Sequence, residues 1–357
     1  MDIYEIALNF ELDGRIINIL ENDVGLINKS YVIITSTNKY IIQKINKSVF
    51  NNPIAIMENI KIVTEHLQKQ NESCESLKLI STKTGNYYLV NNDDYYRCYN
   101  YLKNSISYNY PHNLKHLYEL GKTIARFHYN LKELKITKLK ETIINFHDTK
   151  IRYNNLVTAF INSDSYRQQE TIELYNFVID NKDNINNINF LLQNGSLPKR
   201  IVHNDTKFNN LIFNRLNNKA KCLIDLDTVM PGSILFDFGD AMRSAGTSTN
   251  EEDFDFNKLD FDLDKFTYFT IGYLSNAKDL ICEQEINLLY DSILMITFEC
   301  GMRFLTDYLE YDKYFKINFP KHNLLRAKNQ LLLSKKIIEK KEIIIKTIKL
   351  IKIRFNL

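Results

Sequence analysis

Two hydrophobic periodicities divide this chain, and their order constrains its fold more than any other feature. Strand-like runs fill much of the first hundred residues, and long amphipathic helical patterns dominate from about Leu114 onward, interrupted by a strand-and-turn region at Lys199–Gly239. The sequence therefore predicts an α+β fold with two lobes: a small antiparallel β-sheet lobe at residues 1–102 and a larger, mainly helical lobe at residues 103–357. The predicted strands are Val24–Ser36, Lys39–Asn46, Leu77–Thr82, Asn86–Val90 and Tyr95–Leu102, with a helix beginning at Pro53 after the second strand.

Composition and charge exclude several classes of protein. Lys and Arg total 46 and Asp and Glu total 43, so the net charge of +3 gives no reason to expect nucleic acid as a partner. The five cysteines form no Cys-x-x-Cys pair, and no apolar run approaches the roughly 18 residues typical of a membrane span. Because the N-terminus also lacks the pattern of a signal peptide, we expect a cytoplasmic protein without a membrane span.

The most informative segment is a polar loop between two apolar runs. In Ile201–Phe213, of sequence IVHNDTKFNNLIF, Asp205 and Asn210 lie five residues apart, and Asp225 follows 20 residues after Asp205. A hairpin with its turn near Asn217 and Asn218 would bring Asn210 close to Asp225. A single Asp or Asn in a loop usually caps a helix or forms a turn, but three at this spacing indicate a shared function.

Phosphoryl transfer requires these residue types. One carboxylate orients the attacking hydroxyl, while a carboxylate and an amide oxygen hold Mg²⁺ against the phosphates. We therefore predict Asp205 as the catalytic base and Asn210 and Asp225 as metal ligands.

The first hundred residues supply candidate nucleotide-binding groups. Gly25, Asn28 and Ser30 lie in a loop of small residues whose backbone could approach phosphates, although one glycine is a weak signal. Lys44 lies on the next predicted strand, where a kinase keeps its phosphate-binding lysine. On the following helix, both Glu58 and Glu65 qualify as its acidic partner.

The segments HNDTKFNN and CLIDLDTVMPGSILFDFGDAMR resemble the aminoglycoside phosphotransferase/choline kinase superfamily, and within it the N-acetylhexosamine 1-kinases. The resemblance covers nearly the whole chain. It implies a two-lobed protein-kinase-like fold, Mg-ATP as donor, and transfer to the anomeric C1 hydroxyl of N-acetylglucosamine or N-acetylgalactosamine. It also favours Glu58, in MENI, over Glu65 as the partner of Lys44.

The same resemblance implies further site residues. The segment Arg97–Leu102 matches the hinge that holds adenine, which gives Arg97, Tyr99 and Tyr101 as nucleotide-side residues, and Asp227, Arg303 and Tyr314 match positions on the sugar side.

Two other patterns have a structural interpretation. Asp237-Phe238-Gly239 looks like the metal-binding triplet of protein kinases, but it lies 32 residues after Asp205, so we expect Asp237 and Asp240 to orient loops, with Arg243 as an ion-pair partner. The basic segment at residues 335–357 is expected to dock on its own domain rather than on a membrane.

Three functions compete at this point. The first is an N-acetylhexosamine 1-kinase, the second a kinase for another small alcohol such as an aminoglycoside, choline or another sugar, and the third a nucleotide-binding scaffold without activity. Arg303 suits a neutral sugar better than a polycation, and Asp205, Asn210, Asp225 and Lys44 are all present, which favours an enzyme. We expect a small-molecule sugar as substrate, ATP and Mg²⁺ as cofactors, and a monomer.

Overall fold

The computed structural model describes residues 1–22, 28–47, 49–70, 76–184 and 187–357. They form two compact units. Unit 1 comprises residues 1–107, 130–144 and 212–231, and unit 2 comprises residues 108–129, 145–211 and 232–357. The first segment of unit 1 ends five residues beyond the expected boundary at 102, but its two later segments come from the part of the sequence that was expected in the helical lobe.

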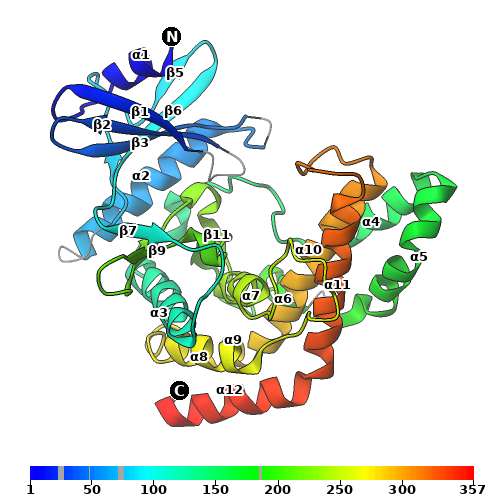
Figure 1. Ribbon diagram of the computed structural model, residues 1–357. Coiled ribbons are helices and arrows are strands. Elements are labelled where there is room, and N and C mark those ends of the chain that lie inside the picture. The colour runs from blue at the N-terminus through cyan, green and yellow to red at the C-terminus, as the bar shows by residue number, and fades with distance from the viewer. Residues whose placement is uncertain (23–27, 48, 71–75, 185–186) are drawn as a thin grey trace. The chain divides into compact units, whose positions relative to one another are not determined.

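Unit 1 contains the expected antiparallel sheet (Figure 1). The strand order is β1 (Ile16–Asn22), β2 (Lys29–Thr35), β3 (Lys39–Lys44), β6 (Asp94–Asn100) and β4 (Leu79–Ile80), and β5 (Leu89–Asn91) also pairs with β6. Helix α1 (Ile3–Leu8) packs on one face, where its apolar side chains join Ile33, Tyr40, Ile42, Tyr96 and Cys98 in a buried cluster. Unit 1 also contains helix α2 (Pro53–Gln70) and a second small sheet of β7 (Ser105–Ser107), β9 (Leu211–Asn214) and β10 (Ala220–Leu223).

The hairpin between β9 and β10 confirms the predicted turn. Asn218 adopts a left-handed conformation with φ of 57°, and its backbone N–H donates to the carbonyl of Asn214. Asn tolerates this region of φ/ψ space better than most residues, so the local sequence suits the turn. The hairpin joins the segment that ends at Asn210 to the segment that contains Asp225.

Unit 2 is built around α10 (Leu289–Leu309), which is buried along most of its length and packs against its neighbours α4 (Thr149–Asn162), α7 (Ile234–Ala245) and α11 (His322–Glu339). It also contains α3 (Leu114–Leu131), α5 (Ser165–Asp180), α6 (Asn187–Gln193), α8 (Leu263–Leu274), α9 (Glu283–Asn287), α12 (Lys341–Phe355) and β8 (Arg200–Val202), while two of the three residues of β11 (Met230–Gly232) belong to unit 1.

Helix α7 explains the Asp-Phe-Gly triplet. The strand-and-turn region was expected to continue to Gly239, but α7 begins at Ile234, so the triplet is helical. A Cβ atom on Gly239 would collide with the carbonyl oxygen of Ser292 on α10, so the glycine permits close contact between the two helices. Packing therefore accounts for this glycine without a metal-binding role.

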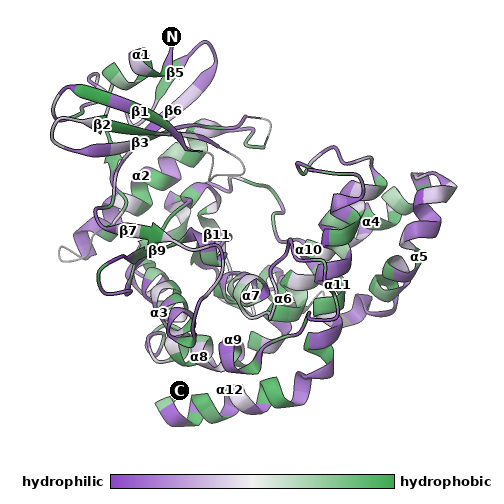
Figure 2. Cartoon of the chain, viewed as in Figure 1, coloured by the Kyte–Doolittle hydropathy of each residue, from purple (hydrophilic) through white to green (hydrophobic). Residues whose placement is uncertain are grey.

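The basic C-terminal segment docks on unit 2, as expected. Figure 2 shows alternating hydrophobic and hydrophilic bands along α12, and Ile344, Ile348 and Ile351 form its buried face. Lys352 also pairs with Glu283, at 2.6 Å between Nζ and Oε1. In the part of the chain that the structure describes, no helix has the length and apolar character that crossing a membrane would require.

Candidate active site

Asp237 on α7 holds the loop that follows β8 in unit 2. The buried carboxylate of Asp237 accepts hydrogen bonds from the backbone N–H groups of His203 (2.8 Å) and Asn204 (2.6 Å). The backbone carbonyl of Asp237 accepts a hydrogen bond from the hydroxyl of Thr206 (2.6 Å). His128 on α3 contacts the same carboxylate through Nε2 at 2.7 Å. The expectation that Asp237 orients a loop is confirmed.

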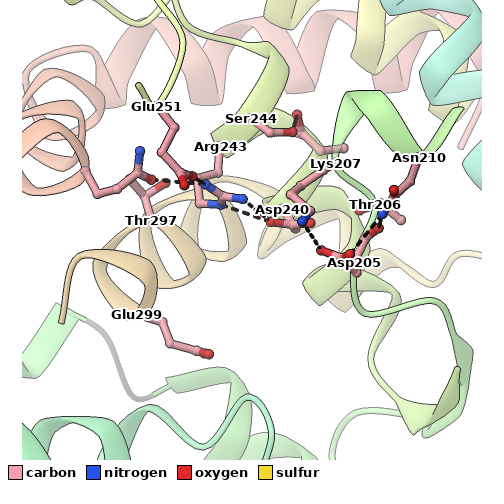
Figure 3. A network of polar contacts seen from close by, with 12 residues as sticks. Asp205, Thr206, Lys207, Asn210, Asp240, Arg243, Ser244, Glu251, Thr297 and Glu299 are labelled. Carbon is pink, nitrogen blue, oxygen red and sulfur yellow. Dashed lines mark hydrogen bonds and ion pairs between the residues drawn. The ribbon is translucent and has the colours of Figure 1, made fainter. Parts of the chain in front are cut away.

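Asp205 lies on this loop with two partners of its own (Figure 3). Lys207 Nζ lies 3.2 Å from Oδ1, and the amide nitrogen of Asn210 donates to Oδ2 at 2.9 Å and to the backbone carbonyl of Asp205 at 2.8 Å. Both side-chain bonds of Asn210 thus use its nitrogen, which leaves the amide oxygen as the atom suited to a metal ion. The side chain of Asp205 is 24% exposed, so it is accessible to a substrate.

The electrostatic environment keeps Asp205 ionised. Burial acts to raise the pKa of Asp205, but Lys207 and His203 outweigh it and hold the pKa below its ordinary value. His203 also accepts from the backbone N–H of Asp205 at Nδ1 (3.3 Å), which agrees with the expectation that it braces the loop.

Asp240 lies beside this group and pairs with Arg243, as expected. The guanidinium lies 2.9 Å from Oδ1 of Asp240 and 2.6 Å from Glu251 (Figure 3). Burial is the main cause that raises the pKa of Asp240, and the negative charge of Asp205 adds to it. Among the described residues, Oδ2 of Asp240 has no hydrogen-bond partner.

Arg303 lies in a second polar group of unit 2. Its guanidinium lies 5.7 Å from the ring centre of Phe146 and 5.4 Å from that of Phe315. Burial acts to raise the pKa of Glu299, but His147, Arg303 and Arg152 outweigh it, so the pKa is lowered. Tyr314, the other predicted sugar-side residue, is 59% exposed.

Asp225, the third member of the predicted metal site, belongs to unit 1. It adopts a left-handed conformation, with φ of 62° and ψ of 61°, at the start of a short 3-10 turn, Leu226–Thr228. Since Asp205 and Asn210 belong to unit 2, their convergence with Asp225 stays a prediction.

Asp227, in the same turn, makes contacts that were not expected. One of its carboxylate oxygens pairs with Arg97, and the other accepts from the amide of Asn28 at 2.6 Å. Its side chain is 3% exposed and that of Arg97 is fully buried. Because both oxygens are engaged inside unit 1, these contacts do not support a direct role for Asp227 in substrate binding.

The expected ion pair between Lys44 and Glu58 is wrong. Lys44 pairs with Asp94 at 2.5 Å, and Glu58 pairs with Lys140. Strand register gives the reason: Gln43 lies opposite Ser30 and Arg97, whereas Lys44 lies opposite Lys29 and Tyr96, and successive residues point to opposite faces. Lys44 therefore lies on the face opposite Gln43 and Arg97.

The other residues predicted to lie beside the nucleotide differ in how far they are buried. Ser30 accepts from Gln43 at 3.0 Å and is buried, as is Tyr99, while Tyr101 is partly exposed and its backbone N–H bonds to the carbonyl of Lys39. Gly25 lies outside the described residues.

Sequence reasoning missed Gln43 and Asn59. Asn59 bonds to the backbone carbonyls of Lys140 and Val229, at 2.7 and 2.9 Å, and so ties α2 to the segment after Asp227. Its position among the apolar residues of α2, beside Ile56, Ile60 and Val63, was the available signal, because a polar residue on a buried face needs a partner.

Solved structures with the same fold are kinases and phosphotransferases. A microcompartment-associated aminopropanol kinase matches with a TM-score of 0.63 at 12% identity, over 95% of this chain and 97% of its own. An aminoglycoside phosphotransferase from Alicyclobacillus acidocaldarius matches with a TM-score of 0.62 at 13% identity, over 97% and 94%. A spectinomycin phosphotransferase in complex with ADP and spectinomycin matches with a TM-score of 0.53 at 14% identity, over 93% and 98%.

These likenesses and the antiparallel sheet with its many helices define a kinase-like fold. The APH phosphotransferase enzyme family matches residues 18–268, a span that includes the polar loop and Asp225. The chain belongs to this family.

Proposed function

We propose that the protein is a Mg-ATP-dependent kinase that phosphorylates the anomeric C1 hydroxyl of an N-acetylhexosamine. The observation that carries the proposal is the arrangement around Asp205, an accessible and ionised carboxylate bonded to both Lys207 and Asn210. Membership of a phosphotransferase family supports the reaction class, and the resemblance of the HNDTK and IDLDTVMPG segments to N-acetylhexosamine 1-kinases supports the acceptor.

Asn210 and Asp225 are the proposed ligands of Mg²⁺. Both offer the oxygen atoms that this ion prefers, and the hairpin of β9 and β10 links them directly in the chain. Mg-ATP, when bound, would supply the phosphoryl group and neutralise its charge. ADP in the spectinomycin phosphotransferase supports an adenine nucleotide as donor.

Except for Lys44, the nucleotide-side residues remain part of the proposal. Lys44, paired with Asp94, lies on the sheet face opposite Arg97, so its position does not support the predicted role in phosphate binding. The backbone at Asn28 and Ser30 would approach the phosphates, and the backbone of Arg97–Leu102, including Tyr99 and Tyr101, would hold adenine.

The acceptor side favours a neutral, hydroxyl-rich molecule. The acidic side chains near Asp205 and Arg303 already have cationic neighbours, since Asp240 and Glu251 contact Arg243, and Arg303 and Arg152 help to lower the pKa of Glu299. Within the described part of the chain, the buried atoms without hydrogen-bond partners include His147 Nε2, Arg152 Nε and Asp240 Oδ2. A sugar brings donors, which Asp240 Oδ2 needs, and acceptors, which Arg152 Nε needs, whereas the ammonium groups of a polycation bring donors only.

Asp205 would act as the base in this reaction. A hemiacetal hydroxyl is more acidic than an ordinary alcohol, so a carboxylate with a low pKa suffices to orient it and accept its proton. Arg303 and Tyr314 would bind the ring substituents, and positioning would supply most of the acceleration.

The test is a screen of ATP consumption with N-acetylglucosamine, N-acetylgalactosamine, glucose, choline, 1-aminopropan-2-ol and kanamycin, followed by ³¹P NMR of the product. Phosphate on carbon 1 of an N-acetylhexosamine supports the proposal. Turnover of an amino alcohol or an aminoglycoside alone supports the second candidate, which the names of the aminopropanol kinase and the aminoglycoside phosphotransferase favour.

The variant Asp205→Asn tests the assignment of Asp205 as the base. Removal of the base should lower kcat by about 10²–10⁴-fold while the binding of Mg-ADP changes little. Full activity in this variant would refute the assignment of Asp205 as the base.

A further inference from the structure

The buried ion pair between Arg97 and Asp227 joins distant parts of the chain within unit 1. Arg97 lies on β6, and Asp227 lies one residue past Leu226 in the turn that begins at Asp225. Their side chains are 0% and 3% exposed. Burial opposes the charged form of Arg97, but the carboxylate of Asp227 outweighs it, so the pKa of Arg97 is raised and the pair is ionic.

Further polar contacts extend from this pair into the sheet. Arg97 Nε donates to Gln43 on β3 at 3.0 Å, and the amide of Gln43 donates to the hydroxyl of Ser30 on β2. Asn28 donates to Asp227 at 2.6 Å and accepts from the backbone N–H of Asn46 at 3.0 Å, so it connects the entry to β2 with the exit from β3.

The backbone on either side of Asp227 is also held inside unit 1. The carbonyl of Asp227 accepts from the hydroxyl of Thr142 at 3.4 Å, and the carbonyl of Val229 accepts from Asn59 on α2 at 2.9 Å. The turn at Asp225 is thus held to the sheet by the guanidinium of Arg97 and to α2 by the side-chain amide of Asn59.

The pair is a poor choice for stability alone. Burial removes both ions from water at a large cost in free energy, and apolar residues of the same size often stabilise a core as well or better. Nη2 of Arg97 is also buried and has no partner among the described residues, which adds to the cost of burying the pair. Because stability alone does not account for these costs, we look for the role of the pair in the position of the turn that contains Asp227.

We infer that Arg97 and Asp227 are positioning residues that hold the left-handed turn at Asp225 in the conformation that binds Mg²⁺. This inference rests on the proposed function, because it assigns Asp225 as a metal ligand. In this arrangement the sheet orients the metal-binding carboxylate through Arg97, while Lys44 and Glu58 pair elsewhere.

A different role for Asp227 makes the opposite prediction. If Asp227 bound the metal directly, removal of Arg97 would free its carboxylate and would strengthen metal binding or leave it unchanged. If the two residues act as one clamp, loss of either has the same effect, and loss of both adds little.

The experiment measures the binding of Mn²⁺ to the full-length protein with saturating ADP and no acceptor, by electron paramagnetic resonance. The variants are Arg97→Gln, Asp227→Asn and the double variant. We expect each single change to raise the Kd for Mn²⁺ about 10–100-fold, as is typical for residues that orient a metal ligand, and the double variant to match the singles. In catalytic assays, the Mg²⁺ requirement should rise while the KM of the acceptor stays within about twofold.

Arg200→Gln is the matched control. Arg200 forms a two-point ion pair with Glu285 in unit 2, at 3.0 and 3.1 Å. Its loss should lower the melting temperature without changing the Kd for Mn²⁺.

Three results would overturn the inference. The first is an unchanged Kd for Mn²⁺ in Arg97→Gln while Asp227→Asn binds Mn²⁺ more weakly, and the second is an unchanged Kd in all variants. The third is failure of even Arg97→Lys to fold, which would show that the pair serves stability. If no acceptor is phosphorylated but Mn²⁺ binding depends on the pair, the proposed function fails and the inference stands.

Discussion

At the scale of single residues, Asp237 shows how a buried charged group can organise a loop through hydrogen bonds to its backbone. It is fully buried, and its carboxylate accepts from two consecutive backbone N–H groups and contacts His128. Burial acts to raise the pKa of Asp237, but His128 and His203 outweigh it, so the pKa is lowered in the folded protein.

Asp237→Asn should therefore change the pH dependence of stability. The unfolded chain binds a proton at Asp237 near pH 4, and the folded protein only at a lower pH. The stabilisation is present above pH 4 and is lost as the pH falls through the folded pKa. We expect the variant to lose about 3–5 kcal/mol at pH 7, because a buried partner is removed, and to show a flatter decline on acidification.

Urea unfolding at several pH values checks this prediction. Asp264→Asn, at an exposed carboxylate on α8, is the control and should stay within about 0.5 kcal/mol of the unmodified protein. Equal acid sensitivity of Asp237→Asn and the unmodified protein would contradict the prediction.

The same residues mark what the sequence can reveal. The spacing of Asp237 from Asp205 was enough to predict a structural role, since a motif has a fixed distance to its partners. The pairing of Lys44 could not be predicted in the same way. The choice between Asp94 and Glu58 depends on which face of β3 the side chain occupies, and a one-residue change in register reverses that face.

At the scale of elements, α12 has two different faces. Ile344 is fully buried and Ile348 and Ile351 nearly so, whereas Ile343, Leu350 and Ile353 are exposed. Amphipathic periodicity was visible in the sequence, but isoleucines occur on both faces, so the docked face could not be identified without the structure.

Ile344→Ala should lower the free energy of unfolding by about 2–5 kcal/mol, because it removes buried methyl groups and leaves a cavity. Ile353→Ala, where the side chain is 71% exposed, should change it by less than about 0.5 kcal/mol. Chemical denaturation of both variants makes the comparison, and equal losses would show that α12 is not docked as described.

Strand prediction succeeded for the central strands and for the short strands β4 and β5, and it failed for β1, at one edge of the sheet. β2, β3 and β6 carry buried apolar residues and were predicted, whereas the edge strand β1 was not. No residue of β1 is fully buried, so its sequence shows no clear alternation.

At the scale of the whole molecule, unit 1 is assembled from three separate segments of chain. A fragment of residues 1–107 contains Arg97 but lacks Asp227, Val229 and Thr142. We expect this fragment to aggregate or to lack a cooperative unfolding transition, because a buried arginine would be left without its counter-charge.

Expression of the fragment with and without Arg97→Met separates the causes. Partial rescue by the apolar residue would identify the unpaired charge as the defect. A fragment that melts cooperatively without this change would contradict the prediction.

The interleaved path of the chain also limits how such a protein can be recombined. A gene fusion that replaced only the first hundred codons would bring in a strand whose arginine must find its aspartate in a stretch encoded more than a hundred codons downstream, in the other parent. Chimaeras of this kind should fold when both stretches are exchanged together, because the two members of the ion pair then come from the same parent protein.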